Sequence, residues 1–435
     1  MKNVLIIAEY FAPNNLIASI RVTKLAKYLK KEQNYHITVL TRKLYPHEVY
    51  DPVSSKDIKY VDHYIAVGKE INKAQGNSSG TVSLAAASSV RKKEIKSNFK
   101  IYLIQIRDWL RREKFIHDTL HAIKESDTQF DAIISSFGPY SCAKLGMKIS
   151  KKFPNALWIM DMRDPITKPF AAEWNRRYHR GLAGRIAKRA DYFTGVSEPC
   201  VSIYKQWRRD ADIYVITNGF DRDDRAGLLY DKKSDLFKII YTGTIKRNRN
   251  DLKPFFRALK ELIAEGKINK DKICIEYAGF TYDLMHEAAK AFNMQGVCKN
   301  YGFVSRDESL RLQSEASLLL VASWNSNEET GILTGKMFEY LMQDKPLIAL
   351  IAGEVGNSFF KEIVAGANSG FIYEEVNKEV DFRKLKEYIE KQYTHFMNDE
   401  PLEYHPNLEY IEQYNWKNLA LKFANIIEAE RKTTK

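Results

Sequence analysis

The sequence has few cysteines and no long uncharged hydrophobic run. Cys142, Cys200, Cys274 and Cys298 are scattered over 435 residues without a CxxC pair. This spacing argues against a structural zinc site and against a disulfide framework, and it fits a reducing cytoplasm. A membrane-spanning helix needs about 18 uncharged apolar residues in a row, and the sequence has no such stretch. We therefore expect a cytoplasmic protein without a membrane span.

Several recognition signatures are missing as well. The apolar run Val4–Ala8 ends at Glu9, so it is too short for the core of a signal peptide and instead predicts a buried first strand. No GxGxxG motif follows it, so nothing indicates NAD. No RNP, KH, zinc-finger or homeodomain pattern occurs, and nucleic acid is therefore not an expected partner.

Positive charge is in excess, and it is unevenly placed. The net charge is +13. Residues 1–218 hold 37 Lys and Arg against 21 Asp and Glu, a balance of +16, whereas residues 219–435 hold 31 against 34, a balance of −3. A basic first half suits an anionic membrane surface, a phosphorylated acceptor or nucleic acid, and the alternative is a solvated basic surface.

Short apolar segments alternate with helical patterns along the chain, which is typical of parallel α/β domains. A chain of 435 residues is too long for one core, so two domains are expected. We predict two Rossmann-like doubly wound domains, with the boundary near Thr217-Asn218-Gly219 because Asn-Gly is a turn signal. The predicted strands are Val4–Ala8, Ile37–Thr41, Ala132–Ser136, Leu157–Asp161, Tyr192–Val196, Ile213–Ile216, Lys238–Tyr241, Ile273–Ala278, Leu318–Ala322 and Pro346–Leu350.

Two segments between the predicted strands of the first half differ from the rest in composition and periodicity. Residues 72–98 are rich in Ser, Ala, Gly and Lys and are predicted to be a mobile insertion. In Phe99–Lys114, apolar residues recur at spacings of three and four and basic residues flank them, which predicts an amphipathic helix. Such a helix can lie on an anionic bilayer or pack its apolar stripe on the sheet, and both alternatives stay open.

Ligands of doubly wound domains bind at the carboxyl ends of the strands. The first strand is followed by a loop and a helix start, which place backbone N–H groups and Arg21 where an anion can bind. Asp161, Arg163 and Asp164 surround the end of another strand, and three charges there must pair with one another or with a ligand. After Lys238–Tyr241, a glycine and several basic residues are suited to a diphosphate.

The most informative stretch runs from Glu328 to Leu350. Gly331 and Gly335 precede an apparent helix, and Lys336 lies in its first turn, where a positive charge is mildly unfavourable for the helix. This local conflict indicates a bound anion. Glu339, one turn further on, is placed to accept ribose hydroxyls, as carboxylates do in dinucleotide folds. The alternative is a glycine turn followed by a surface Lys–Glu pair.

These motifs, in this order, resemble the family-4 retaining glycosyltransferases of GT-B fold, which build bacterial capsule, O-antigen and exopolysaccharide repeats. The resemblance covers nearly the whole chain, and its ordered set of motifs is more specific for the family than for the substrate. It is carried by IIAEYFAP (residues 6–13), YHITVLT (35–41), WIMDMRDP (158–165), ADYFTGVSE (190–198), VITNGFD (215–221), IIYTGTI (239–245), YGFVSRDE (301–308), TGKMFEYLMQDKP (334–346) and YNW (414–416).

The resemblance implies a GT-B architecture, in which the two domains face each other across a cleft. It implies an acceptor-side domain at residues 1–218, a nucleotide-sugar domain at 219–410 and a final helix at 411–435 that packs back on the first domain. The implied donor-binding residues are Gly243, Thr244, Lys246, Arg247, Arg249, Gly331, Thr334, Gly335, Lys336 and Glu339. The predicted catalytic residues are Asp161, Arg163 and Asp164, and the residues of the predicted acceptor-side loop are Asn15, Ser19 and Arg21.

The chain departs from the family pattern at two positions. Gly331 stands where many members have a second glutamate, and Glu328, Glu329 or a backbone group could take its place. Arg163 stands where a histidine is common. These departures leave the orientation of the sugar open.

We therefore expect a retaining, metal-independent transfer of a sugar from a nucleotide-sugar donor to a saccharide acceptor carried on a polyprenyl diphosphate. No cofactor and no metal are expected, because basic side chains and helix N-termini can stabilise the leaving diphosphate and the sequence shows no cluster of metal ligands. The DxD pattern at Asp221 and Asp223 lies in a polar linker. A cytoplasmic location, peripheral at the inner face of the membrane, fits such an acceptor. The alternatives are a nucleotide-sugar epimerase of GT-B fold and a non-catalytic partner or scaffold protein of the same fold.

Overall fold

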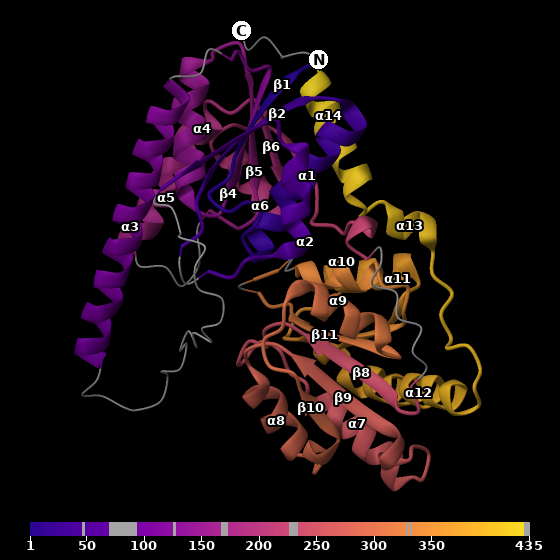
Figure 1. Cartoon of the computed structure of the whole chain (residues 1–435). Coiled ribbons are helices and arrows are strands. Elements are labelled where there is room, and N and C mark those ends of the chain that lie inside the picture. Colours follow the sequence, from indigo (N-terminus) through magenta and orange to yellow (C-terminus); the bar gives the residue numbers. More distant parts are fainter. Residues whose placement is uncertain are drawn as a thin grey trace, which may run out of the picture. The chain divides into compact units, whose positions relative to one another are not determined.

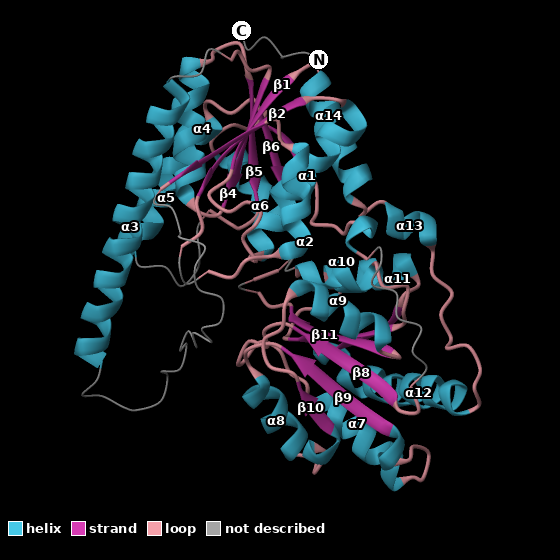
Figure 2. Cartoon of the chain, in the orientation of Figure 1, coloured by secondary structure: helices cyan, strands magenta, loops and turns pink. Residues whose placement is uncertain are grey.

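The chain forms two compact units, each built on one parallel sheet (Figure 1 and Figure 2). The computed structural model describes residues 1–45, 48–68, 94–124, 128–166, 173–225, 234–327, 329–330 and 333–429. Unit 1 comprises Met1–Gly195, Cys200–Tyr214 and Ala424–Lys435, and unit 2 comprises Val196–Pro199 and Val215–Phe423. The predicted fold class, two Rossmann-like α/β domains, is confirmed.

The sheet of unit 1 has seven strands in the order β3-β2-β1-β4-β5-β6-β7. β1 and β4 pair with each other in parallel, for example Val4 with Ala132. The strand order reverses between these two strands. This reversal is the topological switch point at which such sheets bind ligands. The strands are β1 (Asn3–Ile7), β2 (His36–Arg42), β3 (His63–Val67), β4 (Ala132–Phe137), β5 (Leu157–Met162), β6 (Tyr192–Gly195) and β7 (Asp212–Val215).

Helices cover both faces of this sheet, so its central strands are apolar along their whole length (Figure 1). In β1, Val4, Leu5, Ile6 and Ile7 are all fully buried. The α-helices between β1 and β7 are α1 (Ile17–Gln33), α2 (Pro52–Ser55), α3 (Glu94–Lys124), α4 (Tyr140–Lys152), α5 (Glu173–Ala187) and α6 (Glu198–Ser202). Short 3-10 turns follow α2 at Lys56–Tyr60 and α6 at Ile203–Gln206.

Helix α3 is longer than predicted and corrects one expectation. It begins at Glu94, so residues 94–98, which were assigned to the mobile insertion, are helical. Glu and Lys are good helix formers, and the polar composition of this stretch did not exclude a helix. The rest of that insertion, residues 72–93, lies outside the described residues. Phe115 and Ile116 of α3 are buried, whereas Trp109 and Leu110 are about half exposed.

The sheet of unit 2 has six strands in the order β10-β9-β8-β11-β12-β13, again with a reversal next to its first strand. The strands are β8 (Phe237–Thr242), β9 (Ile273–Ala278), β10 (Cys298–Asn300), β11 (Leu318–Trp324), β12 (Leu347–Ala352) and β13 (Gly370–Glu374). The helices are α7 (Lys253–Ala264), α8 (Tyr282–Lys290), α9 (Arg306–Glu315), α10 (Gly335–Leu341), α11 (Phe359–Ala367), α12 (Lys378–Met397), α13 (Leu408–Glu412) and α14 (Trp416–Glu428).

The last helix, α14, is divided between the two units, since its residues from Ala424 onward belong to unit 1. There Glu428 accepts a hydrogen bond of 2.5 Å from the Tyr35 hydroxyl and lies 3.0 Å from Lys2 Nζ. At the other end of α14, the Trp416 amide donates to the Phe220 carbonyl. None of the described helices is long and apolar enough to cross a membrane.

Candidate functional site

In unit 2, the predicted donor residues lie where β8 ends. Gly243 follows β8 with a φ of +90°, and its amide donates to the Ala278 carbonyl over 2.6 Å. A Cβ atom at this position would lie 2.6 Å from Lys336 Cε. The backbone conformation therefore favours glycine here, and any larger residue would also displace the end of the Lys336 side chain.

Lys336 of α10 reaches this strand end with its ammonium group. Its Nζ donates to the Tyr241 hydroxyl and to the Thr244 carbonyl, both over 3.0 Å, and lies 4.3 Å from the centre of the Tyr241 ring. Burial, helped by the charge of Lys246, lowers the pKa of Lys336 to about 7. The contacts of Lys336 are thus with neutral oxygens, and a bound anion would favour its charged form.

Glu339 lies one turn further along α10, where residues of α9 hold its carboxylate. Gln313 donates to Oε1 over 2.7 Å, and Arg306 Nη2 lies 3.6 Å from Oε2. Arg306 also pairs with Asp224 at 3.0 Å. Because about a fifth of the Glu339 side chain is exposed, the oriented carboxylate can still accept hydrogen bonds from a ligand.

The basic side chains of the loop after β8 contact two different parts of unit 2. Arg247 turns to α8, where it pairs with Glu287 at 3.0 Å, and it is more than half exposed. Lys246 and Arg249 instead lie over the Trp324 ring, at 4.6 and 4.7 Å from its centre. The structure therefore brings Lys246 and Arg249 to the end of β11 and leaves Arg247 apart from them.

Glu329 joins this group beside Trp324. Its Oε2 accepts from Trp324 Nε1 over 3.0 Å and pairs with Arg249 at 2.5 Å. Of the two glutamates proposed to replace the missing one, Glu328 lies outside the described residues, as does Gly331. Thr334 and Gly335 are half-buried at the start of α10. The Thr334 hydroxyl is buried and has no hydrogen-bond partner among the described residues.

Two aromatic residues that the sequence analysis did not select border this site. Phe280 and Phe303 are 67% and 45% exposed, and their rings stack with centres 4.3 Å apart. They follow β9 and β10, whose ends are joined by a hydrogen bond of 2.8 Å from Gly279 to the Gly302 carbonyl. The signal was present in the sequence, because both strands are followed by Gly-Phe. Exposed stacked rings beside Gly243 and Gly279 form a flat apolar platform.

In unit 1, Asp161 lies on β5 and is fully buried. It accepts from Arg21 Nε and Nη2 over 2.9 and 2.7 Å, and from the Ser136 and Thr194 hydroxyls. Burial alone would raise the pKa of Asp161, but Arg21 outweighs it and holds the pKa below its usual value. Arg21 is 1% exposed, so the pair ties α1 to the sheet. Ser19 is also buried and donates to the carbonyls of Asn14 and Leu16.

Arg163 and Asp164 follow β5 and reach the loop after β4. Arg163 Nη2 donates to the Gly138 carbonyl, and burial lowers the pKa of the guanidinium. A Cβ atom at Gly138, whose φ is +116°, would lie 2.8 Å from Asp164 Oδ2. Asp164 is exposed. Of the predicted catalytic residues, Asp164 is thus accessible to a ligand and Asp161 is not.

Glu9 in unit 1 is a third residue that the sequence analysis did not select. It follows β1 at the switch point and is 7% exposed. The Ser141 hydroxyl of α4 donates to its carboxylate, and Arg42 Nε lies 3.9 Å away. Burial raises the pKa of Glu9, and Ser141 and the nearby arginines oppose this effect. A buried carboxylate at a strand end is a recognised sign of function.

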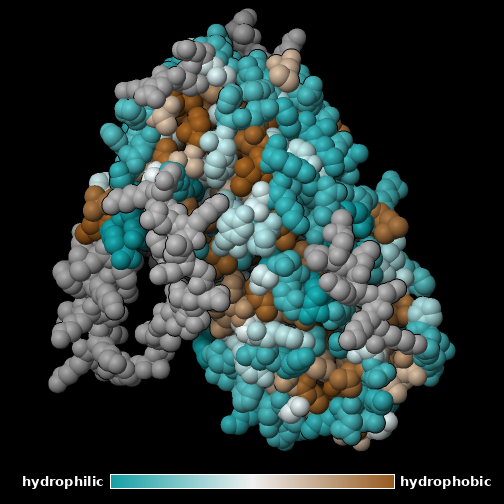
Figure 3. Space-filling model, in the orientation of Figure 1, coloured by the Kyte–Doolittle hydropathy of each residue, from teal (hydrophilic) through white to brown (hydrophobic). Residues whose placement is uncertain are grey.

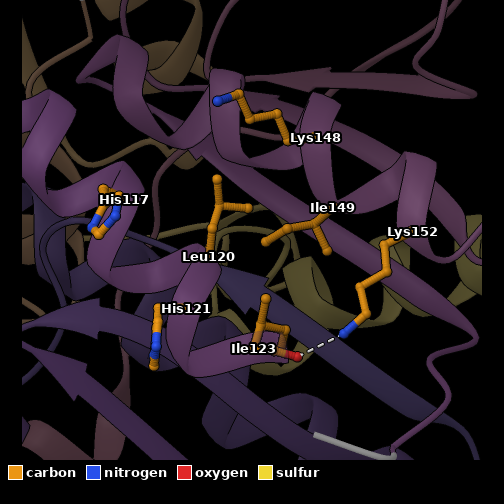
Figure 4. Close-up of a pocket in the computed structure, with 7 residues that line it drawn as sticks. All are labelled: His117, Leu120, His121, Ile123, Lys148, Ile149 and Lys152. Carbon is orange, nitrogen blue, oxygen red and sulfur yellow. Dashed lines mark hydrogen bonds between the residues drawn. The ribbon is translucent and has the colours of Figure 1, made fainter. Parts of the chain in front are cut away.

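The remaining features have structural partners. The Asp221 carboxylate caps a turn by accepting from the Asp223 amide over 3.0 Å. Asn15 donates its amide to the Val49 carbonyl. A groove of about 320 Å³ between α3 and α4 has an apolar floor and basic edges, and none of the predicted site residues lines it (Figure 4). Its lining residues are His117, Leu120, His121, Ile123, Lys148, Ile149 and Lys152.

Solved structures share this fold over the whole chain. The sucrose-phosphate synthase of Thermosynechococcus elongatus aligns with a TM-score of 0.58 at 13% identity, covering 98% of each chain. The lipopolysaccharide outer core galactosyltransferase WaaB aligns with a TM-score of 0.55 at 13% identity, covering 98% of this chain and 99% of that one. A Listeria monocytogenes protein assigned as a UDP-N-acetylglucosamine 2-epimerase aligns at 0.52 and 13% identity, covering 99% and 98%.

These likenesses define the fold as GT-B. No protein-family model matches the chain, and neither does the sequence of any curated protein. At 13% identity the similar structures do not decide between a transferase and an epimerase, because both kinds of protein share the fold. Function must therefore be argued from the residues at the strand ends.

Proposed function

We propose that the protein is a retaining, metal-independent glycosyltransferase that moves a sugar from a nucleotide-sugar donor to a saccharide acceptor. The observation that carries the proposal is the convergence of Lys336, Glu339 and the Gly243 turn at one edge of the unit 2 sheet. A cation, a carboxylate and a close-approach glycine match the diphosphate, the ribose and the backbone contact that such a donor offers.

The diphosphate, the ribose and the base of the donor each have a matching group. The diphosphate would lie against Lys336, with Lys246 and Arg249 nearby on Trp324. Glu339, oriented by Gln313, would accept the ribose hydroxyls. The base would lie on the exposed platform of Phe280 and Phe303, because flat apolar rings stack on nucleobases.

In the reaction, the bond between the anomeric carbon and the donor phosphate oxygen breaks, and its electron pair leaves with the diphosphate. The acceptor hydroxyl oxygen bonds to the same carbon, and its proton passes to the leaving phosphate oxygen. Cationic side chains promote this step because they stabilise charge that grows on the leaving group. Three parts of the proposal rest on the resemblance of the sequence motifs alone. These are the retention of configuration, the membership of family 4, and an acceptor carried on a lipid in cell-surface polysaccharide synthesis.

The donor site can be tested without knowing the acceptor. A thermal-shift panel of UDP-, GDP-, ADP- and dTDP-sugars should identify one class that raises Tm, because a ligand of the native state stabilises it. Calorimetry with that donor should then show about 10- to 100-fold weaker binding for Lys336→Ala and for Glu339→Ala, as expected when a charge-assisted contact is lost.

Glu287→Ala is the matched control, because Glu287 is an exposed glutamate of unit 2 that pairs with Arg247. It should bind the donor like the wild type. Unchanged affinity in both site variants would refute the donor site.

An epimerase remains the second candidate, because a protein assigned that activity shares the fold. Formation of an epimer from the donor in the absence of any acceptor would favour it over a transferase. A non-catalytic partner protein of the same fold predicts no binding to any nucleotide sugar in the panel.

A further inference from the structure

Glu9 is held at the switch point of the unit 1 sheet, by the helix that follows β4. Its amide donates to Cys142 Sγ over 3.1 Å, and the Ser141 hydroxyl donates to its Oε2. The other oxygen, Oε1, accepts no hydrogen bond from the described residues, because Arg42 Nε at 3.9 Å is too far away for one. The side chain is 7% exposed. Oε1 is therefore the oxygen that a ligand can reach.

Arg42, the last residue of β2, is fixed beside Glu9 by other partners. Its two Nη atoms donate to the Glu48 carboxylate. Its guanidinium lies 4.8 Å from the centre of the Tyr10 ring and 4.1 Å from that of the Tyr45 ring. Both rings are half-buried. Because Arg42 is engaged with a carboxylate and two rings, it does not close over Oε1 of Glu9.

Tyr140 and Arg112 complete the surroundings of Glu9. Tyr140 begins α4, the helix that holds Glu9, and Arg112 of α3 lies 5.7 Å from the centre of the Tyr140 ring. Burial raises the pKa of Glu9 and that of Tyr10, and the charge of Arg112 lowers both. Arg112 thus lies within electrostatic range of the end of β1 as well as beside α4. We call these side chains the Glu9 cluster: Glu9, Tyr10, Arg42, Arg112 and Tyr140.

The Glu9 cluster suits an uncharged polar ligand. A carboxylate oxygen only accepts hydrogen bonds, so Oε1 needs a donor. With Glu9 ionised, the two guanidiniums and the carboxylates of Glu9 and Glu48 carry no net charge together. An acidic ligand group would be repelled by Glu9, and an amine by the guanidiniums. The visible surface of unit 1 is also mostly hydrophilic, with hydrophobic residues in small patches (Figure 3).

We propose that the Glu9 cluster binds an uncharged sugar ring of the acceptor, whose hydroxyl donates to Glu9 Oε1 and whose C–H face lies against Tyr10. Aromatic rings with a few placed polar groups are typical of small-molecule sites. The inference rests on the proposed function and gives its acceptor a chemical class, a neutral sugar instead of a phosphorylated or acidic one. Ser19 and Arg21 of the predicted acceptor-side loop are 0% and 1% exposed, less than Glu9.

The test is a saturation-transfer NMR titration of the full chain with methyl glycosides. The neutral probes are the common hexoses, 6-deoxyhexoses and N-acetylhexosamines, and methyl glucuronide is the anionic probe. The variant is Glu9→Gln, which keeps the shape of the side chain and an acceptor for Ser141. Its Tm should not fall, because a buried charge is removed. The matched control is Asp131→Asn, because the Asp131 carboxylate accepts from the Asn3 amide where β1 and β4 begin.

We expect the wild type and the control to bind at least one neutral glycoside, and Glu9→Gln to bind it about 5- to 10-fold more weakly, because a hydrogen bond to a charged acceptor is lost. The wild type should prefer methyl glucoside to methyl glucuronide. Glu9→Gln should reduce this preference, because repulsion by the carboxylate is removed, whereas loss of a structural contact would not change it. Donor affinity, measured by calorimetry, should be the same in both proteins.

A second variant keeps the proposal testable if Glu9→Gln folds poorly. Tyr10→Leu removes the ring and leaves the carboxylate, and it should also weaken binding of the neutral glycoside.

Two results would overturn the proposal. One is the absence of neutral glycoside binding to the wild type, both alone and with the nucleotide sugar that raises Tm. The other is wild-type sugar affinity and charge preference in both folded variants. A thermal-shift panel without any stabilising nucleotide sugar would instead refute the proposed function, and with it the role of the sugar as acceptor. The glycoside titrations alone decide whether the Glu9 cluster binds sugar.

Discussion

At the scale of single residues, Lys336 shows how the site balances charge against burial. Its ammonium group contacts a hydroxyl and a carbonyl but is depleted of water, and its pKa is lowered to about 7. In the unfolded chain the pKa is near 10.5. Between pH 7 and pH 10.5, Lys336 is more often protonated in the unfolded chain than in the native state. Its contribution to the free energy of unfolding therefore increases as pH rises through this range.

Donor binding should have the opposite pH dependence. A diphosphate favours charged Lys336, so binding takes up a proton wherever the free protein has lost one, and affinity should fall as pH rises above 7. The decrease should approach about tenfold per pH unit. Calorimetry in buffers of different ionisation enthalpy would measure the proton uptake. Lys336→Arg, which stays charged, should bind with little pH dependence from 7 to 9.

A second residue-scale prediction concerns the loop after β8. Arg249 lies on Trp324 and pairs with Glu329, whereas Arg247 pairs with Glu287 on α8. Arg249→Ala should weaken donor binding by about 1.5–3 kcal/mol if it contacts the diphosphate. Arg247→Ala should change it by less than about 0.5 kcal/mol. Equal effects in titrations of the two variants would contradict this division of the loop.

At the scale of elements, the Arg21–Asp161 pair holds α1 against β5 inside unit 1. Asp161→Asn should destabilise the protein by about 3–5 kcal/mol, because it leaves a buried guanidinium without its counter-charge. The corresponding fall in Tm is about 10 °C for a unit of this size. Because its pKa is lowered in the native state, the stabilisation from Asp161 is present at neutral pH and is lost as pH falls below about 4.

Asp164→Asn is the contrasting change, because Asp164 is exposed three residues away. We expect Tm to stay within about 1–2 °C of the wild type, as for most exposed positions. Turnover should fall more than donor affinity, since Asp164 belongs to unit 1 and the proposed donor site belongs to unit 2. Unchanged turnover would assign Asp164 a structural role with Arg163 and Gly138.

The sequence predicted the central strands well and the edge strands poorly. Val4–Ala8 and Leu318–Ala322 are uninterrupted apolar runs because both faces of their sheets are covered. β3, β10 and β13 were not predicted, because their apolar runs are short: four residues follow His63 in β3, three follow Gly370 in β13, and Lys299 divides β10. These three segments are strands because each pairs with a neighbouring strand. The residue pattern within one segment does not reveal that pairing.

The same limit applies to the candidate site. Gly243 and Lys336 were selected from glycine and lysine placed after strand signals, and the structure brings their atoms together. The partner of Arg247 and the stacking of Phe280 on Phe303 follow from tertiary contacts between distant segments. Glu9 was overlooked because its partner Ser141 is remote in sequence.

At the scale of the whole molecule, the charge asymmetry coincides with the division into two sheets. Residues 1–218, which hold most of unit 1, carry +16, and residues 219–435 carry −3. The described donor candidates lie in unit 2, whereas the basic half of the sequence forms most of unit 1. Attraction to an anionic surface and binding of an anionic donor would therefore use different surfaces, and substitutions in one should leave the other intact.

The contact between Glu428 and both Lys2 and Tyr35 has a consequence for biosynthesis. Unit 1 combines residues up to Tyr214 with residues 424–428, which are synthesised about 210 residues later. At about 5–20 residues per second, roughly 10–40 s separate the synthesis of its main part from that of its final helical turns. During that interval the surface that Ile426 and Ile427 later cover is open to solvent. The nascent chain would then be a natural client for chaperones, and unit 2 can complete its fold first.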